Sequence, residues 1–205
     1  MPRKVKLGVL ASGRGSNLQA IIDNIEAGKL SAEIAVVISD NEDAKALERA
    51  RKHNIKAVYI PPGTHKTYLD DEVEKEYVKC LKENGVELVI LAGFMRVIKK
   101  RFFEEYSGRM MNIHPALLPS FKGLEGQRQA FEYGVKVSGC TVHFIDEFVD
   151  HGPIICQASV PVLEEDTVET LSTRILKEEY RIYSEAIQLY AEGRLKIEEK
   201  KVRVV

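Results

Sequence analysis

Short apolar runs alternate with segments of helical spacing along the first half of the chain. Val5–Leu10 is an apolar run that ends at a glycine-rich turn, which is typical of a buried strand. The next apolar residues recur with the i, i+3, i+4, i+7 spacing of one helix face, and Ser16 or Asn17 is the expected N-cap of that helix. The same alternation predicts strands at 34–38, 57–60 and 88–92 and helices at 43–53 and 68–84. Strands that alternate with helices predict an α/β fold in which helices cover both faces of a parallel sheet.

The second half of the chain has a more mixed pattern. Strand-like runs occur at 109–114, 138–144 and 154–160, and helical spacing occurs at 127–133 and 167–192. The tail, 195–205, alternates and predicts an edge hairpin. Because no repeat, low-complexity tract or flexible linker interrupts the chain, we expect a single domain over residues 1–205, with halves at 1–98 and 99–205.

Composition and charge exclude several classes of protein. The 205 residues carry 30 Lys and Arg against 31 Asp and Glu, and a net charge of -1 argues against a dedicated nucleic-acid binder. No apolar run approaches the roughly 20 residues of a membrane helix, and Met1–Lys4 leads into the first strand without the apolar stretch of a signal peptide. Cys80, Cys140 and Cys156 form no C-x-x-C pair, which fits a reducing compartment. We therefore expect a cytoplasmic protein without membrane or nucleic-acid partners.

The first candidate for chemistry is the glycine-rich loop Ser12–Asn17 between the first strand and the first helix. Glycines let backbone N–H groups approach an anion, and the helix N-terminus adds a favourable partial positive charge. The dinucleotide-binding fingerprint is incomplete, because Leu18 stands where its third glycine would be. The loop therefore predicts a phosphate site, and a tight turn without a ligand is the alternative.

The second candidate is the run Asn112-Ile-His-Pro115 at the end of a strand. Residues two apart on a strand share a face, so Asn112 and His114 point the same way. An amide that binds an oxyanion beside an imidazole that supplies or takes a proton suits carbonyl chemistry. A histidine that only satisfies buried backbone groups is the alternative interpretation.

Asp150 is the third candidate, in a loop between two predicted strands. An aspartate near His114 would orient or charge that imidazole, whereas most acidic loops are simply solvated. The remaining histidines form no H-E-x-x-H pattern, and no G-x-S-x-G elbow is present. The sequence therefore predicts neither a metal site nor a serine hydrolase.

Four motifs occur in an order that resembles one enzyme family. They are Ala11-Ser-Gly-Arg-Gly-Ser-Asn-Leu-Gln-Ala-Ile21, Leu91-Ala-Gly-Phe-Met-Arg96, Asn112-Ile-His-Pro-Ala-Leu-Leu-Pro119 and Asp150-x-Gly-Pro-Ile-Ile155. Over nearly its whole length the chain resembles the phosphoribosylglycinamide formyltransferases, also called glycinamide ribonucleotide transformylases, within the folate-dependent formyltransferases. The resemblance implies a Rossmann-like formyltransferase fold, with a phosphate-binding first half and a catalytic, folate-binding second half.

The resemblance also implies a reaction and its residues. The formyl group of 10-formyltetrahydrofolate passes to the amine of glycinamide ribonucleotide, in the de novo synthesis of purines, without a metal. Asn112, His114 and Asp150 fall on the catalytic positions of the family. The ribonucleotide positions are Gly15, Ser16, Asn17 and Glu179, and the folate positions are Lys66, Met95, Arg96, Val97, Ile98 and Asn112.

Elementary chemistry agrees with these catalytic roles. An amine that attacks a formyl carbon forms an oxyanion, to which Asn112 can donate a hydrogen bond. A protonated His114 can stabilise that oxyanion and deliver a proton to the departing folate nitrogen. Asp150 is expected to favour the imidazolium, because an opposite charge raises the pKa of a histidine.

The chain departs from the family at one point, and other functions remain open. Many relatives carry histidines where this chain has Glu125 and Gln127, which puts any auxiliary role for histidines there in doubt. A formyltetrahydrofolate deformylase or a methionyl-tRNA formyltransferase would have a further domain, for which we expect no room here. A nucleotide-binding or NAD-sensing module would use Asp40 as its ribose partner and leave His114 idle. The partners we expect are small molecules, with the protein a monomer or a homodimer.

Overall fold

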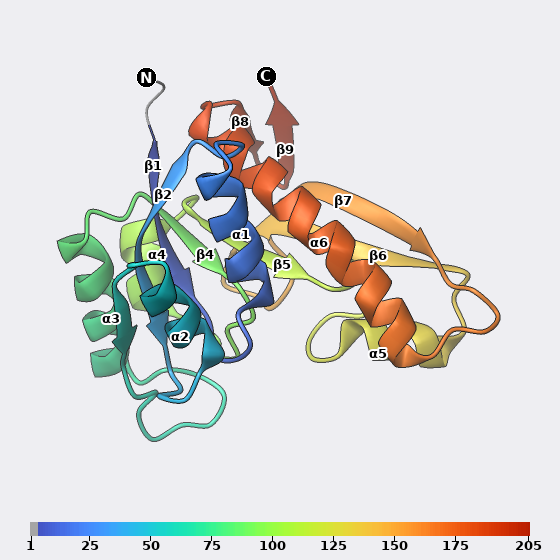
Figure 1. Cartoon of the computed structure of the whole chain (residues 1–205), viewed down its shortest axis with the longest axis horizontal. Coiled ribbons are helices and arrows are strands. Elements are labelled where there is room, and N and C mark those ends of the chain that lie inside the picture. The colour runs from blue at the N-terminus through green and yellow to red at the C-terminus, as the bar shows by residue number, and fades with distance from the viewer. Residues whose placement is uncertain (1–3) are drawn as a thin grey trace. The chain divides into compact units, whose positions relative to one another are not determined.

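The computed structural model describes residues 4–205, so the prediction for Met1–Arg3 lies outside the described residues. The chain divides into one unit that ends at Met111 and a second unit, Asn112–Val205. Figure 1 labels most of the helices and strands of both units. The helices and strands occur in the predicted order along the chain, apart from one additional helix at Lys100–Tyr106.

The first unit contains a parallel sheet of four strands in the order β3-β2-β1-β4. The strands are β1 (Val5–Leu10), β2 (Ala32–Ser39), β3 (Ala57–Tyr59) and β4 (Leu88–Leu91). Val9 and Leu10 are adjacent on β1, so their side chains point to opposite faces of the sheet, and neither is exposed. Both faces of β1 are therefore covered, as the sequence predicts for a parallel sheet.

Four helices connect or follow these strands. They are α1 (Ser16–Glu26), α2 (Lys45–Lys52), α3 (Asp71–Glu83) and α4 (Lys100–Tyr106). The prediction of Ser16 or Asn17 as the N-cap of α1 is wrong, because Gly15 is the cap residue, in the left-handed conformation, with no side-chain cap bond. The predicted helix from 68 begins later, at Asp71, because residues 64–70 form a loop of their own.

Helix α4 is an element that the sequence pattern did not predict. It has only 7 residues, so it shows little helical periodicity. Its start is held from outside, because the buried carboxylate of Glu74 on α3 accepts hydrogen bonds from the backbone N–H groups of Lys99 and Arg101. Burial raises the pKa of the Glu74 carboxyl, and these two N–H groups partly offset that shift. A tertiary contact thus supplies the cap that the local sequence lacks.

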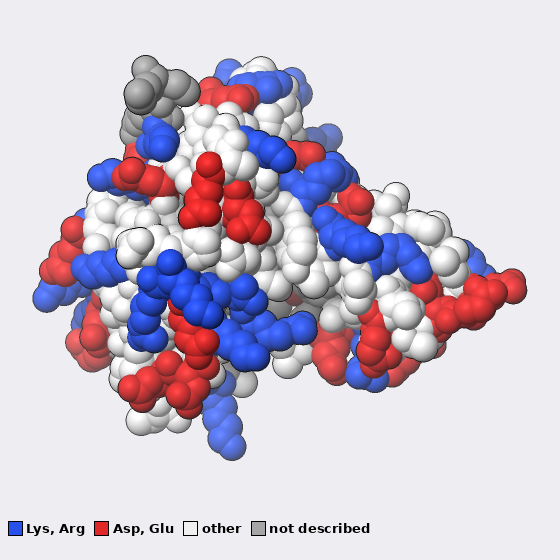
Figure 2. Space-filling model, in the orientation of Figure 1, with Lys and Arg blue, Asp and Glu red and all other residues white. Residues whose placement is uncertain are grey.

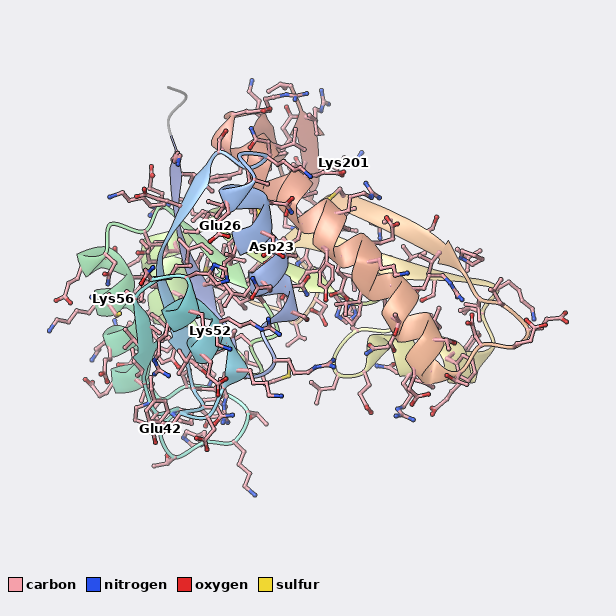
Figure 3. The ribbon with its side chains drawn as sticks, viewed as in Figure 1. Asp23, Glu26, Glu42, Lys52, Lys56 and Lys201 are labelled. Atoms are coloured by element: carbon pink, nitrogen blue, oxygen red, sulfur yellow. The ribbon has the colours of Figure 1, made fainter. Side chains whose placement is uncertain are left out.

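The charged surface of the first unit is uneven. Figure 2 shows Lys and Arg side chains gathered over the part of this unit where Figure 1 places α2. Three basic residues occupy the last turn of α2, namely Arg49, Arg51 and Lys52. His53 follows them, and its Nδ1 lies 2.6 Å from a carboxylate oxygen of Glu26 at the end of α1. Figure 3 labels Glu26 on α1 and Lys52 on α2.

The second unit is a mixed sheet covered by two helices. Its strands follow the order β5-β6-β7-β9-β8, where β5 (Met110–His114) enters from the first unit. The other strands are β6 (Val137–Phe144), β7 (Ile154–Pro161), β8 (Leu195–Glu198) and β9 (Lys201–Val204), and the helices are α5 (Gly126–Tyr133) and α6 (Val168–Ala191). β6 pairs with β7 antiparallel, and β8 with β9 forms the predicted edge hairpin.

Helix α6 lies along β6 and β7, as Figure 1 shows. Its N-terminus has a capping box, in which the Thr167 hydroxyl accepts from the Thr170 N–H and the Thr170 hydroxyl accepts from the Thr167 N–H. Its apolar face is buried and includes Leu171, Ile175, Ile182 and Ala186. This packing holds β6 and β7, the strands on either side of the loop that contains Asp150.

Candidate active site

Strand β5 presents Asn112 and His114 on one face, as the period of two residues predicts. Ile113 between them is buried at 7% exposure. His114 is buried as well, at 3% exposure, whereas Asn112 is only partly buried. Of this pair, the Asn112 amide is the group that solvent or a small molecule reaches more easily.

Asp150 lies beside His114, in the loop between β6 and β7. Its Oδ2 is 3.2 Å from His114 Nδ1 and accepts a 2.8 Å hydrogen bond from the backbone N–H of Gly123. Its Oδ1 is 3.5 Å from the Asn112 amide nitrogen, Nδ2. The three predicted catalytic residues are therefore brought together around one carboxylate, although Asp150 is 36 positions from His114 in the chain.

Both ring nitrogens of His114 face oxygen acceptors. Nε2–H donates to the carbonyl of Phe121 at 2.8 Å, and Nδ1 faces Asp150 at 3.2 Å. A neutral ring carries one N–H, so it leaves the other nitrogen's lone pair against an oxygen, and only the imidazolium satisfies both contacts. The site is thus arranged to stabilise His114 once it has taken up a proton.

Burial works against that protonated form. It lowers the pKa of His114 below its ordinary value of 6.5, and the Asp150 charge and the bond to the Phe121 carbonyl offset the shift only in part. The expectation that Asp150 favours the imidazolium holds for its own contribution, but burial outweighs it. Burial also opposes ionisation of Asp150, yet the nearby ring of His143 and the hydrogen bond from the Gly123 N–H bring the pKa of that carboxyl below its ordinary value. At neutral pH the site therefore holds a carboxylate beside a mainly neutral imidazole.

His143 is a member of the cluster that the sequence analysis did not select. Its Nδ1–H donates to the carbonyl of Phe144 at 2.7 Å, so in the neutral ring Nε2 is an acceptor. That nitrogen lies 3.4 Å from the Asn112 amide nitrogen and 3.7 Å from Asp150 Oδ1. His143 thereby fixes which end of the Asn112 amide points at Asp150. No local motif marks it, because the contact depends on the pairing of separate strands.

Gly126 closes the cluster at the start of α5. A Cβ built on Gly126 would lie 3.0 Å from His114 Nε2 and 2.9 Å from the Phe121 carbonyl oxygen. Both distances are shorter than side chains normally allow, so a larger residue would disturb the bond between His114 and Phe121. The absence of a side chain at this position is therefore part of how His114 is oriented.

Glu125 and Gln127, where this chain departs from the family pattern, lie in different surroundings. Glu125 is exposed, caps α5 with a φ of 56° and lies 3.3 Å from Arg128. Gln127 is partly buried, and within residues 4–205 its Oε1 is a buried atom without a hydrogen-bond partner.

Glu179, the predicted ribose contact, is buried on α6 at 7% exposure. Burial is the largest cause of the raised pKa of the Cys140 thiol, and the charge of Glu179 raises that pKa further.

The glycine-rich loop in the first unit is held by its neighbours. Gly15 has a φ of 66°, and a Cβ on it would lie 2.8 Å from the Cα of Ala46 on α2. The Ala46 N–H donates to the Gly13 carbonyl at 3.1 Å, and Arg49 Nε donates to the Arg14 carbonyl at 2.9 Å. The loop therefore turns against α2 and leads directly into the N-terminus of α1, where an anion would be favoured.

The segment Met95–Ile98 lies after β4 in the same unit. The Met95 N–H donates to the Ser12 hydroxyl at 2.9 Å, which ties this segment to the glycine-rich loop. Met95 and Val97 are exposed at 57% and 40%, whereas Ile98 is buried at 6%. Of these side chains, the exposed ones are available to a ligand, and Ile98 can offer only its backbone. Lys66 is exposed in the loop that precedes α3.

Two kinds of feature, a metal-binding group and a membrane-spanning helix, are not found among the described residues, 4–205. These residues contain no group of three His, Cys, Asp or Glu side chains placed to hold a metal ion. They also contain no helix that is long and apolar enough to cross a membrane.

Comparisons with known proteins agree with the geometry. A model of the formyl transferase family matches residues 5–187. The phosphoribosylglycinamide formyltransferase of Haemophilus influenzae is 40% identical over 195 residues, which are 95% of this chain and 91% of that protein. The human trifunctional purine biosynthetic protein adenosine-3 is 44% identical over 198 residues; these cover 96% of this chain, and the chain spans 19% of that longer protein.

A solved structure extends the similarity to the fold. The crystal structure of glycinamide ribonucleotide transformylase 1 from Symbiobacterium toebii matches with a TM-score of 0.94 and 52% identity. The match covers 98% of this chain and 94% of that one. The predicted α/β fold with a mostly parallel sheet is therefore confirmed.

Proposed function

Because the chain belongs to the formyl transferase family, we propose that it transfers the formyl group of 10-formyltetrahydrofolate to the amine of glycinamide ribonucleotide. The products are formylglycinamide ribonucleotide and tetrahydrofolate, and the step belongs to the de novo synthesis of purines. The observation that carries this proposal is the cluster of Asn112, His114 and Asp150, which supplies an amide donor, a buried imidazole and a carboxylate in one place.

Asn112 is the oxyanion donor of this mechanism. As the amine nitrogen bonds to the formyl carbon, the carbonyl oxygen gains negative charge and requires a hydrogen-bond donor. The Asn112 amide is partly exposed, and His143 and Asp150 hold its nitrogen in place at 3.4 Å and 3.5 Å. These long contacts leave the amide hydrogens free to shift toward a stronger acceptor.

His114 carries a proton from the attacking amine nitrogen to the departing folate nitrogen. In its neutral form it accepts the proton that the amine loses on attack, and Asp150 and the Phe121 carbonyl then stabilise the imidazolium. The imidazolium returns the proton to the departing folate nitrogen as the bond between that nitrogen and the formyl carbon breaks. Proton transfer of this kind contributes about 10² to 10⁴ in rate.

In this proposal, the substrates are bound mainly by backbone groups in loops of the first unit. Gly15, Ser16 and Asn17 hold the phosphate of the ribonucleotide at the N-terminus of α1, where the N–H groups are not used by the helix. Glu179 of the second unit accepts from its ribose. The folate is bound by the predicted set Lys66, Met95, Arg96, Val97, Ile98 and Asn112, with Ile98 acting through its backbone.

The partners that we propose are these two small molecules. No metal takes part in the mechanism, because the proton shuttle and the amide donor supply the required chemistry. We propose a cytoplasmic enzyme, monomeric or homodimeric, without nucleic-acid or membrane partners.

An absorbance assay for tetrahydrofolate tests the proposal directly. With 10-formyltetrahydrofolate as donor, tetrahydrofolate is expected only when glycinamide ribonucleotide is present. Tetrahydrofolate formed equally well without the ribonucleotide would identify a deformylase instead. A melting temperature raised by NAD and unaffected by the ribonucleotide would favour the nucleotide-binding alternative, in which Asp40 contacts a ribose.

A further inference from the structure

Asp40 is a buried acid that the proposed reaction does not use. It follows β2, and its side chain is only 4% exposed. Its Oδ2 accepts a 2.7 Å hydrogen bond from Arg96 Nε, while within residues 4–205 its Oδ1 is buried without a partner. A carboxylate held this deeply is costly unless it is paired, so its charge is committed to Arg96 rather than to a ribose.

Arg96 links Asp40 to a loop of the same unit. Its Nη1 donates to the carbonyl of His65 at 3.2 Å and also to the carbonyl of Lys66. One planar guanidinium therefore connects the end of β2 with the backbone of the segment between β3 and α3. The side chain of Arg96 is thus engaged within the protein through Nε and Nη1.

The loop that receives these bonds, residues 61–70, has other anchors on both sides of Lys66, among them the stacking of His65 on Tyr68 and the buried side chain of Leu69. At its far end, the carboxylate of Asp70 accepts from the Thr64 N–H at 2.8 Å and lies 3.2 Å from the His65 ring. In its middle, the Thr67 carbonyl accepts from the Val97 N–H at 2.9 Å. The Lys66 side chain is exposed, so its place is set by the backbone at residues 65–67.

We propose that Asp40 is a positioning residue for the folate. By orienting Arg96, it fixes the backbone at His65 and Lys66, from which the Lys66 side chain extends, beside the segment Met95–Ile98. This inference rests on the proposed function, because it assigns Lys66 and that segment to the folate. Asp40 does not touch a substrate and acts only through Arg96.

Asp40→Asn is the first test, because it removes the charge and keeps the shape. The Kd for tetrahydrofolate, measured by calorimetry, is expected to rise by about tenfold, as for the loss of a charge-assisted hydrogen bond. The KM for glycinamide ribonucleotide is expected to change by less than about twofold, because the bonds of Asp40 and Arg96 hold the loop at His65 and Lys66 rather than Gly15–Asn17. Hydrogen exchange of the backbone amides at 64–68 is expected to become faster.

Companion variants separate positioning from a general loss of structure. Arg96→Gln should produce the same selective rise, and the double variant with Asp40→Asn should add little to either single change. Arg96→Lys keeps the charge but loses the planar fork, so it should give an intermediate Kd. Glu42→Gln is the matched control, because Glu42 is an exposed acid two positions from Asp40 and is labelled in Figure 3. Its Kd for tetrahydrofolate should equal that of the unchanged protein.

Lys66→Ala separates this inference from the proposed function. If Lys66→Ala raises the Kd for tetrahydrofolate and Asp40→Asn does not, the role of Asp40 is overturned while the folate assignment stands. If both substrates lose affinity equally in Asp40→Asn, Asp40 is merely structural and the inference is again overturned. If Lys66→Ala leaves the Kd unchanged, the assignment of Lys66 is wrong and the role of Asp40 falls with it.

Discussion

The candidate residues in the two units are different kinds of groups. In the second unit the candidates are titratable or amide side chains, packed around the Asp150 carboxylate and mostly buried. In the first unit they are mainly backbone groups, on loops that side chains such as Ser12 and Arg96 tie down. The difference indicates that proton transfer requires a desolvated cluster, whereas recognition of anionic and ring-shaped ligands is achieved by fixed backbone geometry.

Removing the proton carrier should produce the largest effect and confine it to one unit. For His114→Ala we expect kcat to fall by at least about 10² while both KM values change little, because the imidazole acts in the transition state. Steady-state kinetics measures this, with thermal unfolding as a check on the fold. His53→Gln, a histidine change in the first unit, is the control and should keep its kcat. Near-normal turnover in His114→Ala would remove that residue from the mechanism.

Altering the carboxylate should have a smaller effect on the same cluster. Asp150→Asn removes the anion that opposes the effect of burial, so the pKa of His114 should fall further below 6.5. NMR titration of the His114 ring measures the shift. The low-pH limb of kcat/KM should move to lower pH with it, because the neutral ring is the form that accepts a proton. An unchanged pKa would contradict the pairing of these two side chains.

A change in the phosphate loop should affect binding rather than chemistry. Ser16→Glu places a negative charge at the N-terminus of α1, where the phosphate is proposed to bind. The KM for glycinamide ribonucleotide should rise by about tenfold or more, through like-charge repulsion, while the KM for the folate stays within about twofold. Equal changes in both KM values would show that the loop does not distinguish the substrates.

The smallest predicted effect is on stability, and it comes from residues of the second unit. Because the folded pKa of His114 lies below 6.5, the unfolded chain takes up a proton at this residue first as the pH falls. The free energy of unfolding should therefore decrease below pH 6.5, by up to about 1.4 kcal/mol per pH unit from this one group. Asp150 has the same sign, because its folded pKa is also lowered, but it acts only near and below its ordinary value of 3.8. Urea unfolding of His114→Gln between pH 4 and 6.5 should show a shallower decrease; an identical slope would contradict the assigned shift.

Local pattern was enough to predict most of the fold. Fully apolar runs such as Leu88–Leu91 predict their strands, and the helical spacing in Ser16–Glu26 predicts its helix. The pattern failed where another segment decides the outcome. α4 depends on Glu74 from α3, and the N-cap of α1 depends on the close contact between Gly15 and Ala46.

The candidate site divides in the same way. Asn112 and His114 could be predicted because they are two apart on a strand and followed by proline. The proximity of Asp150 followed from the resemblance and not from its acidic loop. His143 could not be selected, and the sequence indicated Asp40 only as the ribose partner of the alternative function, because the contacts that matter join separate strands and loops.

The most direct test of formyl transfer follows the formyl carbon itself. With 10-formyltetrahydrofolate labelled with ¹³C in the formyl group, and with glycinamide ribonucleotide present, NMR should show the label in a new amide on the ribonucleotide. The same experiment with His114→Ala should show this signal growing at least about 10² times more slowly. Label recovered as free formate, with the ribonucleotide unchanged, would contradict the account.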